Sequence, residues 1–521
     1  MSRHFITVLG TGNYSECVYE MEDGQFACKT PFVQIAVLKY VMPDFKRGDK
    51  ITVFATEKAE EKNWNTTITA TPQNNGGKSK PVQKKLRFGK KTFHLQFQME
   101  SAAEADSLSS GGTERKGLDA LLQEEFPEVQ RTIVRIPEGR NARELNQIFE
   151  CIYGALSNGE TIFFDFTHGL RNLPMQALAV VNYAKVLKRV KVRGLYYGAF
   201  ELGTLQDDGL RHVQILDMSF CSTLQDWTSA AEAFVKTGSS NQIKTLYQRL
   251  NDTDNADSGY KNILNSLYDL TNCLETSRGT IDSANRTDAT PPNSRNSIYC
   301  ACKTFQDQYK ELYSGRLSTQ DHPATDQPIE RLIEYIYRDV KILSSRKLFL
   351  ERDGRQVKMR YTALGMSAVQ WALDKNLIQQ GFTALNETII SYICELYNVP
   401  AKFWLWREDV RRTVRSVSVD YEDERYPRDV RETYWIPDWK KKNPDLVEKF
   451  GEQAKEILLT LPESVFMLVK QIANDRNSLN HFGFSNDGTL LAYDVLRRRL
   501  VDRYQRMNQI LENTPGITGS V

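Results

Sequence analysis

Residues 160–181 read "ETIFFDFTHGLRNLPMQALAVV", and this stretch decides the fold of the first part of the chain. It begins with a short apolar run, continues through the polar loop "THGLRN", and changes to helical spacing after Pro174. A buried strand that ends in a polar loop at the start of a helix is typical of one step of a strand–helix–strand unit. The stretch therefore predicts a parallel sheet with helices packed on its faces.

The same alternation continues on both sides of this stretch. Further strands are predicted at residues 4–10 ("HFITVLG"), 50–56 ("KITVFAT"), 131–137 ("RTIVRIP") and 191–200 ("KVRGLYYGAF"), and helices at 32–42, 117–126, 141–156 and 174–190. Residues 1–222 are therefore expected to form a Rossmann-like, doubly wound α/β domain with a mostly parallel sheet. A polar insertion over about 71–116 interrupts the pattern, and "KKTFHLQFQM" (90–99) within it suits a hairpin strand.

After residue 222 the helical period dominates, and 521 residues are too many for one ordinary core. We expect a helical middle region at 223–328, with polar loops at 277–296 and 315–328, and an all-helical domain at 329–521. Residues 404–446 form a dense stretch of balanced charges, which favours a solvated excursion. The expected fold is thus α/β followed by all-α.

Composition limits the possible functions. The chain has 68 Lys and Arg against 66 Asp and Glu, so a nucleic-acid surface must be a local patch. Eight scattered cysteines show neither zinc-finger spacing nor a disulfide framework. Neither a signal region nor an apolar run of about 18 residues is present. We expect a soluble cytoplasmic protein with no membrane segment, no metal and no resident cofactor.

The first candidate binding loop is "GTGNY" (10–14), directly after the first strand. A Gly-x-Gly turn lets backbone amides approach a phosphate closely. However, Ser15 replaces the third glycine of a dinucleotide fingerprint, and no Gly-Lys-Ser/Thr follows as in a P-loop. Taken alone, the motif is equally typical of a tight turn at the end of a strand.

A second candidate loop follows the strand at 160–166 and is richer in polar groups. It contains Asp165, Thr167, His168, Gly169, Arg171 and Asn172, all before Pro174. Ligands of open parallel sheets bind at the carboxyl ends of strands, near the topological switch point. The strand that ends "GLYYGAF" adds Tyr196 and Tyr197 to the same edge. An isolated His168 would be a buried residue that ties the turn together, but this concentration of polar groups favours a site for an anionic nucleotide.

Together, "GTGNY" and "DFTHGLRNLP" resemble the CARF domain of CRISPR-associated proteins of the Asp-x-Thr-His-Gly type, over about residues 3–220. The resemblance implies a Rossmann-like homodimer that binds a ring-shaped oligoadenylate across its two-fold axis, through the loops after its first and fourth strands. Cyclic tetra-adenylate is the expected ring. The implied activator contacts are Gly10, Thr11, Gly12, Asn13, Tyr14, Thr167, His168, Gly169, Arg171 and Asn172. The resemblance leaves open whether the insertion covers the ligand, and whether Thr11 or His168 supports slow cleavage of the activator.

A third candidate site lies in "ANDRNSLNHFGF" (473–484). Arg476 continues a helical apolar stripe, so a cation follows core-facing positions, and the Gly483 break lets His481 turn towards the same space. Histidine serves as general acid or base near neutral pH, and arginine stabilises charge on a phosphate. This pair suffices for metal-free RNA cleavage by the 2′-hydroxyl. No carboxylate cluster with metal-ligand spacing accompanies it, which argues against a two-metal nuclease.

"RNSLNH" resembles the HEPN ribonuclease signature, Arg-x4-6-His with a polar residue after the arginine. This resemblance implies Arg476, Asn477 and His481 as catalytic residues, in a cleft that two chains build together. A CARF-like domain followed by this motif resembles the ancillary ribonucleases of type III CRISPR systems. It implies a homodimer, or a higher oligomer, that cleaves single-stranded RNA when cyclic oligoadenylate binds. The arginines at 497, 498, 499 and 503 either hold RNA phosphates or form a solvated face.

Two other functions stay open from the sequence. In the first, the CARF-like domain is a ligand-sensing module and the helical domain is catalytically silent; the intact Arg-Asn-x-x-x-His set argues against this. In the second, the sheet belongs to a nucleotide-dependent metabolic enzyme. Ser15 in place of the third glycine, and the lack of a ribose-binding acid, make that the weakest alternative.

Overall fold

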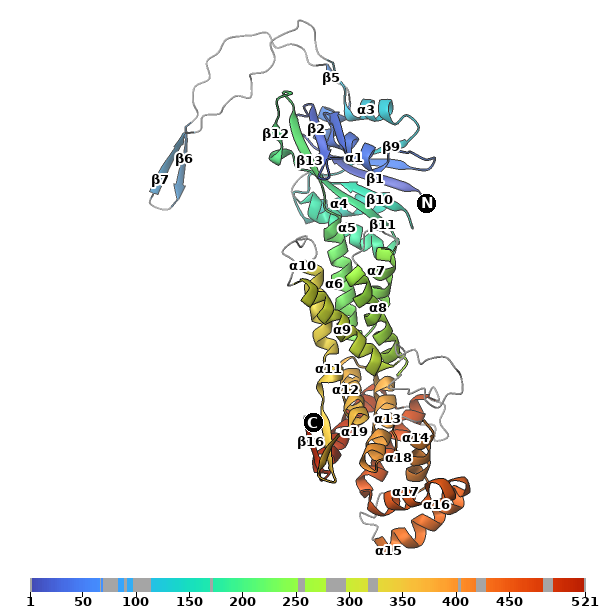
Figure 1. Ribbon diagram of the computed structural model, residues 1–521. Helices are drawn as coiled ribbons and strands as arrows, with labels where there is room; N and C mark the ends of the chain where they lie inside the picture. Colours follow the sequence, from blue (N-terminus) through green and yellow to red (C-terminus); the bar gives the residue numbers. More distant parts are fainter. Residues whose placement is uncertain are drawn as a thin grey trace. The chain divides into compact units, whose positions relative to one another are not determined.

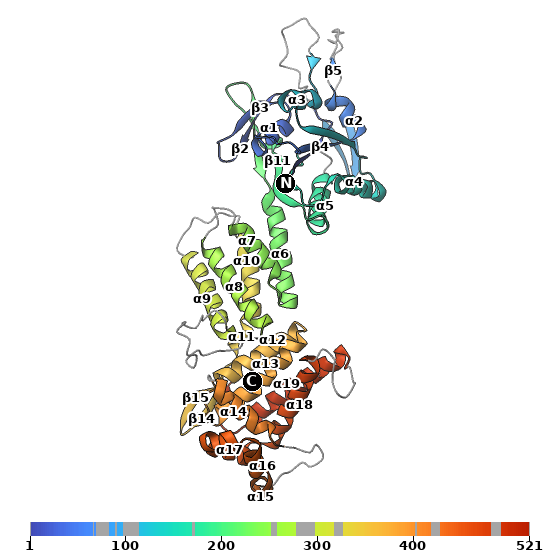
Figure 2. The same cartoon turned by 90° about the vertical axis from the view of Figure 1, so that its right-hand side faces the viewer.

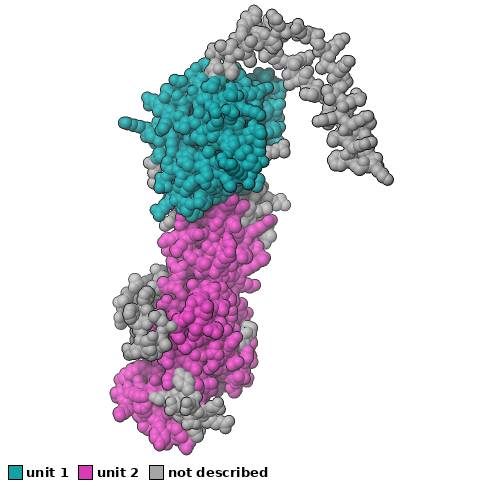
Figure 3. Space-filling model, turned by 180° about the vertical axis from the view of Figure 1, so that it is seen from behind, with its two compact units in different colours: residues 1–223 teal, residues 224–521 magenta. Residues whose placement is uncertain are grey.

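The computed structural model describes residues 2–65, 67–68, 83–88, 91–96, 114–168, 172–251, 258–277, 297–316, 327–401, 404–417, 428–480 and 491–519. The chain divides into two compact units, residues 1–223 and 224–521 (Figure 3). The boundary falls inside helix α6 (Ser219–Thr237). Among the described residues, no helix is both long and apolar enough to cross a membrane.

A single large sheet forms the centre of the first unit (Figure 1). Its strands, in spatial order, are β3 (Ala27–Thr30), β2 (Cys17–Met21), β13 (Arg211–Asp217), β11 (Lys191–Gly198), β10 (Thr161–Asp165), β1 (Arg3–Leu9), β4 (Lys50–Ala55) and β9 (Gln130–Arg135), and β12 (Thr204–Leu205) pairs with β13. From β11 to β9 all neighbours are parallel. The predicted parallel core is confirmed, and antiparallel pairs occur only towards the β3 side.

Helices cover both faces of this sheet. They are α1 (Val33–Val41) and α3 (Leu118–Glu125) on one face, and α4 (Ala142–Ala155) and α5 (Leu173–Leu187) on the other. Along β1, Phe5 packs with the first pair of helices and Ile6 with the second. Because successive side chains point to opposite faces, a strand buried on both sides needs an uninterrupted apolar run. This explains the near-continuous apolar runs of β1, β4 and β10 and confirms the doubly wound fold.

The strand order creates a topological switch point beside β1. After β1 the chain forms β2 and β3 at the far edge of the sheet, then runs through β4 and β9 on one side of β1 and returns to β10 on the other side. Thr7 of β1 lies opposite Asp165 of β10 in the parallel register. The loops that follow these two strands therefore leave the sheet side by side, at the edge where ligands of such sheets bind.

The β2–β3 hairpin was not predicted. No strand is predicted between residues 11 and 31, although Asp23-Gly24 is a strong hairpin signal and Gly24 has a φ of +67°. In the insertion, β6 (Gln83–Phe88) pairs antiparallel with β7 (Lys91–Gln96), which confirms the expected hairpin there. β5 (Thr67–Ile68) pairs with β8 (Glu114–Arg115). The other residues of the insertion up to 113 lie outside the described part of the chain.

The second unit is largely helical (Figure 2). Its helices after α6 are α7 (Asn241–Asn251), α8 (Ser258–Glu275), α9 (Ile298–Arg316), α10 (Gln327–Val340), α11 (Ile342–Ser345), α12 (Arg360–Asp374), α13 (Ile378–Leu396), α14 (Trp404–Arg415), α15 (Arg428–Val430), α16 (Ile436–Lys442), α17 (Val447–Thr460), α18 (Glu463–Asn480) and α19 (Tyr493–Asn513). One apolar cluster joins α6–α10 to α12, and a second joins α12–α14 to α16–α19. α12 contributes to both clusters, and the boundary expected near residue 328 stays a prediction.

A small sheet interrupts the expected all-helical region. β14 (Leu348–Arg352) pairs with β15 (Arg355–Lys358) and with β16 (Ile517–Gly519). Asp353 and Gly354 both have positive φ, +51° and +70°, as a tight hairpin turn requires. The region is therefore largely, and not entirely, helical.

The charged stretch at 404–446 is not a solvated excursion where the structure describes it. α14 and α16 lie in this stretch, and their apolar residues Val410, Val414 and Trp439 are buried. Several of the charges pair across helices, as Arg412 does with Asp445 at 2.7 Å. The balance of charges thus comes from helix-to-helix ion pairs around a packed core.

Candidate functional site

The two amino-terminal motifs meet at the switch point. A Cβ atom on Gly10 would lie 3.2 Å from Cβ of His168, so a side chain at position 10 would crowd the second loop. The Tyr14 ring packs edge-on against the His168 ring, with centroids 4.6 Å apart. The Gly10 amide donates to Oη of Tyr14 at 3.0 Å. Residues more than 150 positions apart therefore form one continuous surface.

Asn63 holds the first loop from behind. Its Nδ2 donates to the carbonyls of Gly10 at 2.8 Å and Gly12 at 3.0 Å. Asn63 is buried, whereas Thr11, Gly12 and Asn13 are exposed. The loop is thus fixed through its carbonyl groups and presents the exposed part of its backbone outward.

Two cations hold the same loop at its other carbonyls. Lys62 Nζ donates to the carbonyl of Thr11 at 2.8 Å, and Arg115 donates to the carbonyl of Tyr14 at 3.0 Å. Sequence reasoning missed these positioning residues together with Asn63. They come from the π-helical segment η1 (Glu60–Trp64) and from β8, and no local motif marks them.

The Asp-x-Thr part of the second motif has a structural role. Asp165 is fully buried and accepts from Oγ1 of Thr7 at 2.6 Å and from Oγ1 of Thr167 at 2.5 Å. Thr167 Oγ1 in turn accepts from the Gly198 amide at 2.7 Å. Burial raises the pKa of Asp165, while the hydrogen bonds from Thr167 and Thr7 oppose this shift. These contacts tie the ends of β1, β10 and β11 together beneath the loop.

His168 presents a neutral ring to the site. Burial lowers its pKa to about 4, against a smaller opposing effect of Glu201. Its Nε2 atom and Oδ1 of Asn172 are buried and have no hydrogen-bond partner among the described residues. Buried polar atoms are normally satisfied, so both atoms are candidates to bind a ligand. Gly169 and Arg171 lie outside the described residues.

The helix that follows adds a further feature for anion binding. Asn172 directly precedes α5, and Pro174 lies in its first turn. The free N–H groups at a helix N-terminus favour negative charge. Tyr196 is buried in the sheet and unavailable for stacking, whereas Tyr197 lies over Phe166 with ring centroids 6.3 Å apart.

In the second unit, α18 carries the first two residues of the expected catalytic set. Val465, Val469 and Ile472 are buried along one stripe, and Arg476 follows at the same spacing, as predicted. Nε of Arg476 is buried without a partner among the described residues, and Asn477 is exposed. His481 follows the last residue of α18 and lies outside the described residues. Its distance from Arg476 therefore stays a prediction.

The arginines of α19 do not form an open row. Arg499 donates to the buried Asp475 at 2.7 Å, and Arg503 donates to the same carboxylate at 3.3 Å. Arg498 bonds to the carbonyl of Asp494, and Arg497 to Asn376. Arg499 and Arg503 thus fasten α19 to α18.

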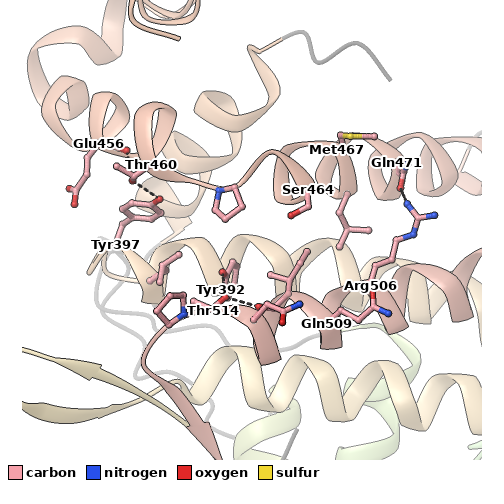
Figure 4. Close-up of a pocket in the computed structure, with 16 residues that line it drawn as sticks. Tyr392, Tyr397, Glu456, Thr460, Ser464, Met467, Gln471, Arg506, Gln509 and Thr514 are labelled. Carbon is pink, nitrogen blue, oxygen red and sulfur yellow. Dashed lines mark hydrogen bonds between the residues drawn. The ribbon is translucent and has the colours of Figure 1, made fainter. Parts of the chain in front are cut away.

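A separate pocket lies on another face of α18 (Figure 4). Its volume is about 720 Å³, and α13, α17, α18 and α19 line it. Figure 4 shows Arg506 reaching towards Gln471 and a hydrogen bond between the hydroxyls of Tyr392 and Thr514. The two hydroxyl oxygens are 2.8 Å apart. Ser464, Met467, Leu468 and Gln471 face the pocket, whereas Arg476 belongs to a different stripe of the helix. The pocket is therefore distinct from the expected cleavage site.

Comparison with known proteins identifies the first unit. Residues 4–201 match the family "CRISPR system endoribonuclease Csx1, CARF domain". The CRISPR-associated protein MJ1674 of Methanocaldococcus jannaschii is 20% identical over 256 residues, which are 49% of this chain and 32% of that relative. The sheet and its two loops are thus a CARF domain, which implies a nucleotide ligand. More particularly, the chain carries the CARF domain of the Csx1 family of CRISPR-associated proteins, while it spans about a third of the length of the curated relative.

Proposed function

We propose that this protein is an endoribonuclease of type III CRISPR antiviral defence, which cleaves single-stranded RNA without a metal ion when cyclic oligoadenylate binds. The observation that carries the proposal is the combination of two features in one chain. The Csx1-type CARF domain has two loops that contact each other at the switch point. In the helical unit, Arg476 and Asn477 lie in the last turns of α18, and His481 directly follows this helix.

The activator site is proposed at the switch point. The exposed backbone of residues 11–13, the neutral His168 ring, Oδ1 of Asn172 and the α5 N-terminus together offer donors and acceptors to phosphates and adenine edges. Gly169 and Arg171 are proposed as further contacts. A ring of four adenylates is the expected activator.

An exposed apolar face of α5 supports a homodimer. Met175 is 77% exposed, Tyr183 47%, Val186 76% and Leu187 54%, and these residues share one side of the helix. Contiguous exposed apolar surface of this kind marks protein interfaces. Because α5 starts at the second loop, pairing of two copies here would place both sets of loops beside one ring. Val186→Glu is expected to weaken activator binding and dimerisation in sedimentation experiments, and unchanged behaviour in both would contradict this interface.

The proposed chemistry needs one proton acceptor and one cation. His481 takes the proton of the 2′-hydroxyl, the 2′-oxygen attacks the adjacent phosphorus, and the bond to the 5′-oxygen of the next nucleotide breaks. This 5′-oxygen takes its proton from water. The products are a 2′,3′-cyclic phosphate and a free 5′-hydroxyl. Arg476 stabilises the charge that develops on the phosphate. Two chains are proposed to combine their pairs in one cleft.

The decisive experiment is cleavage of a labelled single-stranded RNA in EDTA, with cyclic tetra-adenylate, cyclic hexa-adenylate or no activator. Activation by one ring, abolished in His481→Ala, is the expected result. If no ring activates cleavage, the helical unit is catalytically silent and the protein is a ligand sensor. If cleavage survives the substitution, the Arg476–His481 pair is structural and is not the cleavage site.

A further inference from the structure

A row of arginines on α14 lies beside Arg476. Arg407, Arg411 and Arg415 are four residues apart, so they share one face of the helix with a rise of about 6 Å between neighbours. α14 packs against both α13 and α18. The row therefore lies next to the helix that carries the proposed catalytic arginine, and any role of the row in binding substrate rests on the proposed RNA cleavage.

The first two arginines of the row are fully engaged within the protein. Arg407 donates to Glu387 Oε2 at 2.9 Å and to Ser391 Oγ at 2.8 Å. Arg411 donates to both oxygens of Glu387 at 2.8 Å and to Glu408 at 2.5 Å. Although burial raises it, the guanidinium groups of Arg411, Arg407 and Arg476 hold the pKa of Glu387 below its ordinary value. One carboxylate is thus shared by several cations.

Arg415 differs from them because it is exposed and its hydrogen bond is made to a neutral group. Its guanidinium donates to Oδ1 of the buried Asn386 at 3.3 Å. Among the described residues, no carboxylate lies within ion-pair distance of it. Desolvation, and then the neighbouring Arg411 and Arg476, lower its pKa, with Glu408 and Glu387 opposing. The Arg415 guanidinium stays charged at neutral pH. Arg476 lies close enough for its charge to affect the pKa of Arg415.

The local charge is therefore unbalanced. Within the described residues, the guanidinium groups of Arg407, Arg411, Arg415 and Arg476 outnumber the carboxylates that act on them, which are those of Glu387, Glu408 and Glu395. Cations that are held together without enough counter-charge repel one another, and an anion bound among them relieves this repulsion. A nucleic-acid backbone is such an anion, and arginine matches phosphate geometry.

We propose that Arg415 binds a backbone phosphate of the RNA adjacent to the phosphate that Arg476 holds, with Asn386 aiming its guanidinium. Arg415 is thus a substrate-binding residue of the cleavage site, whereas Arg407 and Arg411 keep α14 in place through Glu387. The local basic patch that a nearly neutral protein needs for RNA lies here.

The test measures the affinity of full-length protein for labelled single-stranded RNA over a range of salt concentrations, with His481→Ala as the parent so that the RNA stays intact. Arg415→Gln keeps a donor for Asn386 but loses the charge, and Arg415→Lys keeps the charge. Arg355→Gln, on an exposed arginine of β15, is the matched control. We expect Arg415→Gln to weaken binding about tenfold and to make the slope of log affinity against log salt shallower by about 0.7 per lost contact. Arg415→Lys should retain most of the affinity, and the control should not change it.

Three outcomes have distinct meanings. An unchanged thermal midpoint in Arg415→Gln, together with the weaker binding and the shallower slope, supports the proposal. If Arg415→Gln binds like its parent while protein with intact His481 still cleaves RNA, the role of Arg415 is overturned and the proposed function stands. If the parent does not bind RNA at all and the intact protein does not cleave it, the proposed function fails and this role fails with it.

Discussion

The loop at residues 10–14 and the arginine cluster around Arg476 are the two sites proposed for anionic ligands, and they are built differently. In the loop, carbonyl groups are fastened by Asn63, Lys62 and Arg115, so the backbone itself is held in position. In the cluster, long cationic side chains project from helices and a few carboxylates hold them. The loop therefore depends on shape and on neutral groups such as the His168 ring, whereas the cluster depends on charge.

This difference suits the two proposed ligands. A small ring has one defined shape, which a pre-formed loop can match with little loss of entropy. A single RNA strand has a repeating charge and a variable sequence, which cations bind with a strong dependence on salt. Substitutions in each region, and a change of pH, test whether the loop and the arginine cluster act independently of each other.

The largest effect is expected from Arg476→Ala. Loss of a cation that stabilises the transition state should lower the cleavage rate by about 10²- to 10³-fold, whereas activator binding should be unchanged. Asn474→Ala, at an exposed position of the same helix, is the control and should cleave normally. Cleavage assays with saturating cyclic oligoadenylate measure both, and a loss of activator affinity in Arg476→Ala would show that the regions are not independent.

Asn63→Ala should impair the other region, the loop at residues 10–14. Two carbonyl groups lose their donor, so the loop loses its fixed geometry and activator affinity should fall about tenfold or more. Lys62→Ala removes one exposed contact and should have a smaller effect. Calorimetric titration with cyclic tetra-adenylate measures both affinities. Equal losses in the two variants would mean that the loop is not held by the buried amide.

Acid should destabilise the CARF unit through His168. Because burial lowers its pKa to about 4, the folded state keeps the ring neutral while the unfolded chain binds a proton below about pH 6.5. Stability is therefore full above that pH and falls by about 2 kcal/mol on going to pH 5. His168→Gln should lack this loss, so its thermal midpoint at pH 5 should move closer to that at pH 7 by about 4–8 °C. Identical pH profiles of the two proteins would contradict the assignment.

The smallest effect is expected from Arg499→Ala. Its guanidinium is bound to the buried Asp475, so the substitution removes a fastening between α18 and α19 rather than a contact with RNA. The free energy of unfolding should fall by less than about 1 kcal/mol, since the arginine is partly exposed. RNA affinity, measured as for Arg415→Gln, should stay within about twofold of the parent. A loss of RNA affinity as large as that of Arg415→Gln would indicate that the RNA-binding surface lies on α19 instead.

Two elements that sequence reasoning missed carried a local signal after all. Asp23-Gly24 and Asp353-Gly354 each sit between alternating residues, and both turn β-hairpins. Other parts were predicted because the signal was local and strong. Buried strands need uninterrupted apolar runs, and the α18 stripe ends in Arg476 at the expected position.

The sequence by itself determined the parallel sheet, the two loops at its switch point and the helix that presents Arg476. Each of these follows from the spacing of apolar residues within one segment, which reports burial directly. Only the tertiary structure decided that Asn63 and Arg115 hold the first loop and that Arg415 stands beside Arg476. These groups are brought together by packing between distant segments. No local pattern encodes such a contact, because its partners are set by the topology of the whole unit.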